Sequence, residues 1–197
     1  LSAAFLAAHP LNAGKEAPAN RIWPWSPGRR PRLEPFSVCY DGRRGAVISA
    51  GDVIKGIGKS SGMEVIEVPG ATGFLDTNYA GKVAAALEAI QRNDLVYVHV
   101  EAIDECSHLG DLKLKMQAIE DFDSKIVAPV LAALKGKGIT FAVLPDHPVP
   151  IKLRKHTTTP VPLAIAGPGI DLRAGMCPRA GCPPPPGMTG ATAGLRF

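Results

Sequence analysis

Two short polar stretches of the sequence place an aspartate and a histidine close together, each at the end of an apolar run. Asp104 and His108 belong to "DECSH", and Asp146 and His147 belong to "PDH". Residues four apart on a helix point the same way, so Asp104 and His108 would present a carboxylate and an imidazole together. An isolated pair of this kind is also typical of a plain helix start, with Asp104 as the cap and His108 on the exposed face.

A third such position is His156, in "RKHTTTPVPLAI", just before another apolar run. Of the other histidines, His99 lies within an apolar run and is interpreted as a packed core residue, and His9 is assigned no role. Carboxylates and imidazoles suit Zn²⁺, Mn²⁺ or similar ions, and two such ions about 3.5–4 Å apart can act together in phosphoryl transfer. We predict one metal-binding cluster, on the order of 10 Å across, formed by Asp104, His108, Asp146, His147 and His156.

Apolar segments of two lengths alternate along the chain and predict its fold. Short runs rich in β-branched residues predict strands at 45–49, 63–68, 94–102, 138–145 and 161–167. Longer amphipathic segments predict helices at 50–62, 78–93 and 112–134, and Pro129 kinks or splits the last. The evenly apolar run at 94–102 predicts a strand buried on both faces. The pattern predicts a three-layer α/β/α domain with a mainly parallel sheet, whose ligands bind beyond the carboxyl ends of the strands.

Composition limits the classes of function. The chain has 197 residues, 46% of them hydrophobic, and no apolar stretch approaches the roughly 20 residues that span a bilayer. Four cysteines without a C-x-x-C pair argue against a zinc ribbon or a disulfide scaffold and favour a cytoplasmic location. The net charge of +4 gives no indication of nucleic-acid binding. Four basic residues are candidates for binding a phosphate group, with ordinary surface charge as the alternative: Arg29, Arg30, Lys55 and Lys59.

Four stretches resemble the cofactor-independent phosphoglycerate mutases of the archaeal type, members of the alkaline phosphatase superfamily. They are "PANRIWPWSPGRRPRL" (18–33), "AVISAGDVIKGIGKSSGMEVIEVPGATGFLDTNY" (46–79), "DLVYVHVEAIDECSHLGDLKLKMQAIEDFD" (94–123) and "DHPVPIKLRKHTTTPVPLAIAGPGI" (146–170). The resemblance covers residues from about 9 to 170. It implies an alkaline-phosphatase-like core and a glycolytic isomerase that interconverts 3-phosphoglycerate and 2-phosphoglycerate through a phosphoenzyme. It also implies two divalent metal ions and no requirement for 2,3-bisphosphoglycerate.

The resemblance assigns the five ligands to two ions, one held by Asp104, His108 and His156 and the other by Asp146 and His147. The family also uses a nucleophilic Ser or Thr and a further Asp from an amino-terminal stretch, and nothing in residues 1–36 resembles that stretch. The sheet is then expected to be incomplete on its amino-terminal side, and the isolated chain to be inactive as a mutase. If the chain did turn over, the first nucleophiles to consider would be Ser60, Ser61 and Thr72.

The chain divides into three predicted segments. Residues 1–36 are loop-rich, with one short helix before His9, and are interpreted as a remnant of an inserted domain or linker. Residues 37–170 form the metal-binding core, and the Pro/Gly-rich residues 171–197 predict a disordered tail. Two other functions stay open, namely another phosphatase or phosphotransferase of the same superfamily and a non-catalytic metal-binding fragment. The expected partner is a small phosphorylated substrate, with no nucleic acid and no membrane.

Overall fold

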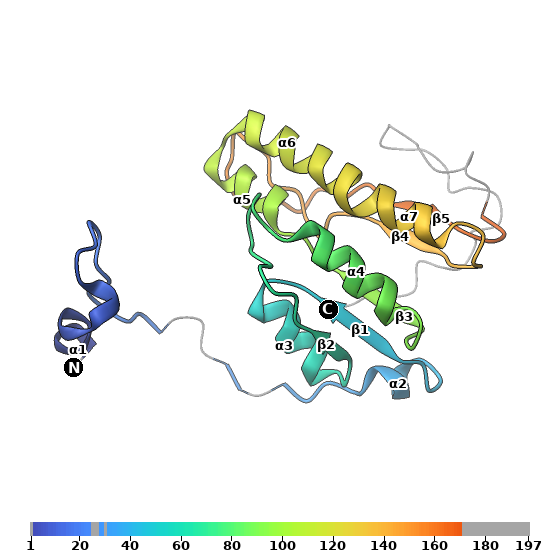
Figure 1. Ribbon diagram of the computed structural model, residues 1–197, viewed down its shortest axis with the longest axis horizontal. Helices are drawn as coiled ribbons and strands as arrows, with labels where there is room; N and C mark the ends of the chain where they lie inside the picture. The colour runs from blue at the N-terminus through green and yellow to red at the C-terminus, as the bar shows by residue number, and fades with distance from the viewer. Residues whose placement is uncertain (1, 25–27, 30, 171–197) are drawn as a thin grey trace. The chain divides into compact units, whose positions relative to one another are not determined.

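The computed structural model describes residues 2–24, 28–29 and 31–170 (Figure 1). Arg30 and the predicted tail at 171–197 lie outside the described residues. The chain forms two compact units, Leu1–Arg32 and Leu33–Phe197. The first contains the helix α1 (Ser2–Ala8), which was expected before His9, and a 3-10 turn, η1 (Pro10–Asn12). The second opens with the short helix α2 (Phe36–Cys39) and contains all the remaining elements.

A parallel sheet organises the first half of the second unit. Its central strand is β1 (Gly45–Ile48), which is flanked by β2 (Glu64–Ile66) and β3 (Leu95–Val98). The helix α3 (Asp52–Ser60) packs on β1 and β2, and the helix α4 (Tyr79–Ala89) packs on β1 and β3. All four residues of β1 are buried, so this strand carries the core of the sheet. The predicted parallel sheet is confirmed.

Two packed helices follow the sheet and support one side of the candidate site. The helix α5 (Ala102–Leu109) packs on α6 (Leu112–Phe122) through the fully buried Ala102, Cys106 and Ala118. A π-helical turn, η2 (Asp123–Val127), joins α6 to α7 (Ala128–Leu134). Pro129 lies in the first turn of α7, directly after the π-helical turn, and has no N–H to donate to the preceding turn. The helix predicted at 112–134 is therefore present and interrupted near Pro129, as expected.

Two features of the sheet differ from the prediction. The strands β4 (Phe141–Val143) and β5 (Ala164–Ala166) form a separate antiparallel pair, where the sequence predicted further strands of a mainly parallel sheet. The expectation that the strand at 94–102 is buried on both faces is wrong, because Leu95 and Tyr97 are 43% and 41% exposed. Within the described residues β3 pairs only with β1, and the chain leaves the strand after Val98 to enter α5.

Across the described part of the chain, the helices are too short or too polar to cross a membrane.

Candidate metal centre

The helix α5 places Asp104 and His108 on one side. Glu101 occupies the N-cap position of this helix, so Asp104 is not the cap that the plainer interpretation assumed. Instead, Asp104 lies in the first turn and its Oδ2 is 3.3 Å from Nε2 of His108 in the last turn. Cys106, on another side of the helix, is buried against α6. Packing on α6 therefore leaves the carboxylate and the imidazole together, partly accessible to solvent.

The loop between β4 and β5 carries the other three predicted ligands. Val149 is 5% exposed, and its carbonyl accepts a 2.9 Å hydrogen bond from the ammonium of Lys115 on α6. The N–H of Thr157 donates to the carbonyl of Pro148, also at 2.9 Å, which closes the loop on itself. These anchors hold the loop against α6, and both of its histidines reach α5 as a result.

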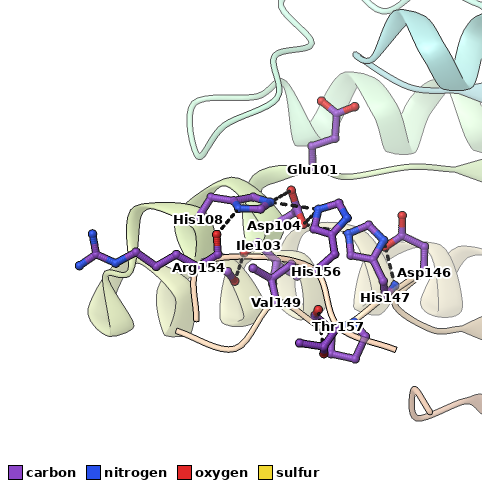
Figure 2. A network of polar contacts seen from close by, with 12 residues as sticks. Glu101, Ile103, Asp104, His108, Asp146, His147, Val149, Arg154, His156 and Thr157 are labelled. Atoms are coloured by element: carbon purple, nitrogen blue, oxygen red, sulfur yellow. Dashed lines mark hydrogen bonds and ion pairs between the residues drawn. The ribbon is translucent and has the colours of Figure 1, made fainter. Parts of the chain in front are cut away.

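Three imidazoles surround the carboxylate of Asp104 (Figure 2). Its Oδ1 is 3.1 Å from Nε2 of His147 and 3.6 Å from Nε2 of His156, while its Oδ2 faces His108. The rings of His147 and His156 stack with their centroids 3.6 Å apart. The carboxylate is 31% exposed and His156 is 54% exposed, so one side of the group is open to a ligand. Asp104 on α5 thus meets His147, which lies 43 residues away in sequence, and His156 on the same loop.

The hydrogen bonds of His108 fix which of its nitrogens is free. Its Nδ1 is 2.9 Å from the carbonyl of Arg154, and a carbonyl only accepts, so this nitrogen bears the hydrogen. Arg154 has φ of 52°, a left-handed conformation that residues other than glycine rarely adopt. In the neutral ring Nε2 then keeps its lone pair, and this atom lies 3.0 Å from Nε2 of His156. An imidazole held in this tautomer by a backbone carbonyl is the usual arrangement of a metal-binding histidine.

The donor atoms of Asp104, His108 and His156 all lie within 4.8 Å of one another, and these residue types fit a divalent cation. Asp146 lies one step further out, where its Oδ1 accepts the backbone N–H of His147 at 2.9 Å and is 3.2 Å from Nδ1 of that ring. Figure 2 shows Asp146 beside the ring of His147, on the side away from His108. The structure thus brings the five predicted ligands together as one connected group.

Two of the predicted phosphate-binding residues, Lys55 and Lys59, do not join this group. Arg29 is exposed within the first unit. Lys55 pairs with Asp52 at 3.1 Å and with Glu67 at 3.3 Å, and these hydrogen bonds raise its pKa. Lys59 lies in the last turn of α3, which runs back between two parallel strands, so it ends at the edge of the sheet opposite the carboxyl ends. Within the described contacts, neither lysine touches Asp104 or its histidines.

A second polar group, which the sequence analysis missed, lies where β1 and β3 end. The Oγ of Ser49 is 3.1 Å from Nδ1 of His99, and an oxygen of Glu101 is 3.5 Å from the same nitrogen. Lys82 on α4 is fully buried and donates a 2.8 Å hydrogen bond to the carbonyl of His99. The sequence did contain a signal for this group, because Ser49 and His99 each follow a strand. Adjacent parallel strands end at the same edge of a sheet, so two such residues can meet there.

Comparison with known families and curated proteins gives one consistent result. The sequence profile described as "Metalloenzyme superfamily" matches residues 7–181. A 2,3-bisphosphoglycerate-independent phosphoglycerate mutase of Methanosarcina acetivorans is 52% identical over 83% of this chain and 43% of its own length. A probable enzyme of the same name from Geobacter sulfurreducens is 48% identical, over 84% of this chain and 41% of its own. The chain spans about two fifths of the length of the curated relatives it matches.

Solved structures agree with this result at the level of the fold. A protein from Pyrococcus horikoshii superposes with a TM-score of 0.70 at 29% identity, over 74% of this chain and 44% of that one. The cofactor-independent phosphoglycerate mutase from Thermoplasma acidophilum superposes with a TM-score of 0.51 at 24% identity, over 71% of this chain and 31% of that one. These likenesses confirm the predicted α/β fold class.

Proposed function

The chain belongs to the metalloenzyme superfamily, and from this premise we propose that it is the metal-binding portion of a phosphoglycerate mutase. The proposed reaction is the interconversion of 3-phosphoglycerate and 2-phosphoglycerate, a step of glycolysis and gluconeogenesis in the cytoplasm. One observation carries the proposal, namely the carboxylate of Asp104 within 3.6 Å of the Nε2 atoms of three histidines. The names of the similar proteins supply the choice of substrate among phosphoryl transfers.

The five clustered side chains are the proposed ligands of two divalent ions. Asp104, His108 and His156 hold the first ion, and Asp146 and His147 hold the second. Mn²⁺ and Zn²⁺ suit this mixture of oxygen and nitrogen donors. When bound, such ions neutralise the charge that develops on phosphoryl oxygens. We propose no requirement for 2,3-bisphosphoglycerate, in keeping with the names of the relatives.

The chain's own contribution is to hold these ligands in place before a substrate arrives. The carbonyl of Arg154 keeps the lone pair of His108 on Nε2, and Asp146 orients the ring of His147 through its Nδ1. The buried Val149 and the ammonium of Lys115 fix the loop on which His147 and His156 stand. Ligands fixed in this way need little rearrangement on binding, which favours positioning of a small phosphorylated acid.

A phosphoenzyme needs a nucleophile, and two of the hydroxyls first considered are already engaged. Ser61 Oγ donates to the carbonyl of Ile57 at 2.9 Å, and Thr72 Oγ1 donates to Asp76 at 2.5 Å. Ser60 lies at the exposed end of α3, away from the carboxyl edge of the sheet. We therefore propose that the nucleophilic hydroxyl comes from a part of the whole mutase outside residues 1–197.

A complementation assay tests this function. The purified chain is loaded with Mn²⁺ or Zn²⁺ and assayed for conversion of 3-phosphoglycerate, alone and together with the amino-terminal portion of the Methanosarcina acetivorans relative. We expect metal binding by calorimetry, no conversion by the chain alone, and conversion with a labelled phosphoenzyme in the complemented sample. An Asp104→Asn chain is the matched control and should not complement. Hydrolysis of phosphate esters without 2-phosphoglycerate formation would favour a phosphatase, and a chain that binds no divalent ion would overturn the proposal.

A further inference from the structure

His99 and Glu101 form an imidazole–carboxylate pair near the five proposed metal ligands. His99 directly follows β3, and its Nδ1 lies 3.5 Å from Oε1 of Glu101. Figure 2 shows the carboxylate of Glu101 pointing away from Asp104, so it does not belong to the ligand group described above. The pair nevertheless stands at the carboxyl end of a parallel strand, the edge at which ligands of such sheets bind.

The partners of Nδ1 determine which tautomer of His99 is favoured. A carboxylate accepts hydrogen bonds and cannot donate, so Glu101 favours a hydrogen on Nδ1. Ser49, 3.1 Å from the same nitrogen, can also accept from it, and its Oγ receives the backbone N–H of Gly51 at 3.0 Å. With the hydrogen on Nδ1, the neutral ring keeps its lone pair on Nε2. That atom is then a proton acceptor held in a fixed orientation.

The same geometry excludes a serine nucleophile at this position. In a Ser-His-acid triad the hydroxyl and the carboxylate bond to different nitrogens of the imidazole. One nitrogen takes the proton of the hydroxyl, and the carboxylate holds the ring in place through the other. Here Ser49 and Glu101 both face Nδ1. Ser49 is also only 2% exposed. Ser49 is therefore a support for the ring.

The packing around Glu101 shows that its position is fixed. Glu101 is the N-cap residue of α5, yet its side chain makes no capping hydrogen bond. It reaches instead between Gly51 and Gly73, where a Cβ on Gly51 would overlap Oε1 and a Cβ on Gly73 would lie 2.7 Å from Oε2. The glycines leave the space that the carboxylate fills. One of them belongs to the "GATGFLDTNY" stretch, so this loop has a packing role at the site.

The charges around His99 favour a neutral ring at neutral pH. Burial lowers the pKa of His99 most strongly, and the charge of Lys82 lowers it further. The charges of Glu101, Asp146 and Asp104 act in the opposite direction. The influence of the two aspartates also means that the ring lies within electrostatic reach of the metal cluster. An imidazole that is neutral but close to carboxylates can both take and return a proton.

We propose that His99 is the acid–base residue of the phosphoryl transfer, with Glu101 as its positioning residue. This inference rests on the proposed function. As the enzyme hydroxyl attacks the phosphorus, Nε2 of neutral His99 takes its proton and gives it to the 3-oxygen of phosphoglycerate as the bond between that oxygen and phosphorus breaks. When the 2-hydroxyl attacks the phosphoenzyme, its proton moves to Nε2 and then to the enzyme oxygen as the enzyme–phosphorus bond breaks. His99 ends with the proton count with which it began.

Nitrogen NMR of the histidine-labelled chain tests the pair without any need for catalysis. We expect His99 to show a protonated Nδ1 and a bare Nε2 in its neutral form. In Glu101→Gln the carboxylate charge is lost, so the pKa of His99 should fall and the preference for this tautomer should weaken. Glu105→Gln, which changes an exposed carboxylate on the same helix, should leave both unchanged. A wild-type ring with the hydrogen on Nε2, or a Glu101→Gln spectrum identical to that of the wild type, overturns the proposal.

The complemented mutase supplies the second measurement. His99→Asn should lower kcat by about 100-fold or more, the usual contribution of a general acid–base group, with metal binding by calorimetry unchanged. Glu101→Gln should shift the pH–rate profile in the direction of the NMR titration. Wild-type kcat in His99→Asn, or an equal loss of metal binding, overturns the acid–base role. If complementation itself fails while the NMR result holds, the proposed mutase function is refuted and the pair stands.

Discussion

The Nε2 atoms of His108 and His156 lie 3.0 Å apart, although 48 residues separate the two histidines in sequence. The carbonyl of Arg154 leaves a lone pair on the first of these atoms, so a proton or a cation is needed between the two rings. We therefore expect Mn²⁺ or Zn²⁺ to raise the thermal midpoint of unfolding and excess chelator to reverse the gain. Because protons compete for the same nitrogens, the gain should shrink as pH falls. Equal midpoints with and without metal would contradict the site.

Asp104 is the residue on which all three imidazoles converge, so its charge should matter most. Asp104→Asn keeps the size of the side chain and removes the negative charge. We expect the affinity for Mn²⁺ or Zn²⁺ to fall by more than about 100-fold, beyond the effect typical of residues that only orient a ligand. Glu105→Gln, an exposed neighbour on α5, is the matched control and should bind metal as the wild type does. Comparable affinities in the two variants would remove Asp104 from the ligand set.

His156 and His147 stack, yet they are assigned to different ions. His156→Ala should weaken the first ion more than the second, because Asp146 and His147 remain in place. Calorimetric titration of the variant should show one of two binding steps reduced. The Nε2 atoms of both rings lie within 3.6 Å of the same oxygen of Asp104, so some coupling between the steps is expected. Equal loss of both steps would mean that the cluster holds a single ion.

Sequence periodicity predicted the elements well where local pattern decides them. The apolar stripe of residues 78–93 and the β-branched run at 45–49 gave the helix α4 and the strand β1 to within a few residues. The antiparallel pairing of β4 with β5 could not be predicted from the sequence, because it depends on which strand lies alongside in the folded protein. The exposure of Tyr97 was missed for the same reason, since burial of a strand face depends on the covering layer.

The residues of the candidate site also divide into those that local sequence pattern could predict and those that depend on tertiary packing. Asp104 and His108 could be paired from their spacing, because four residues make one helical turn. Lys82 could not be found, since nothing in "NYAGKVAAALEA" distinguishes a fully buried lysine from an exposed one. Glu101 was also missed, because its role depends on two glycines that come from distant parts of the chain. Tertiary packing alone sets the surroundings of these two residues.

The buried amine of Lys82 should contribute to stability in a way that depends on pH. Lys82→Ala removes the hydrogen bond to the carbonyl of His99 and leaves a cavity, at a cost of about 2–4 kcal/mol in unfolding free energy. Lys82→Met keeps most of the volume and should cost less. Burial lowers the pKa of Lys82 below its ordinary 10.5, outweighing the charge of Glu101, so the unfolded chain binds this proton more tightly. Stability should therefore rise as pH increases toward 10.5 in the wild type, and urea titrations should show a smaller rise in Lys82→Met.

We expect Gly73 to matter more for the position of the Glu101 side chain than for the stability of the fold. A methyl group at this residue would lie 2.7 Å from Oε2 of Glu101, and the end of a flexible side chain can move aside. Gly73→Ala should therefore cost about 1 kcal/mol or less in unfolding free energy, while it displaces the carboxylate from His99. The pKa of His99, followed by NMR, should then fall as it does in Glu101→Gln.

A double-mutant cycle separates this displacement from a general effect of the extra methyl group. In a Glu101→Ala background the space beside Gly73 is empty, so Gly73→Ala should change neither stability nor the pKa of His99 any further. Gly56→Ala is the matched control, because nothing lies within 4 Å of a Cβ at that position in α3. It should stabilise the helix by about 0.5–1 kcal/mol and leave His99 unaffected. Additive effects of Gly73→Ala and Glu101→Ala on His99 would mean that the glycine acts on the ring by another route.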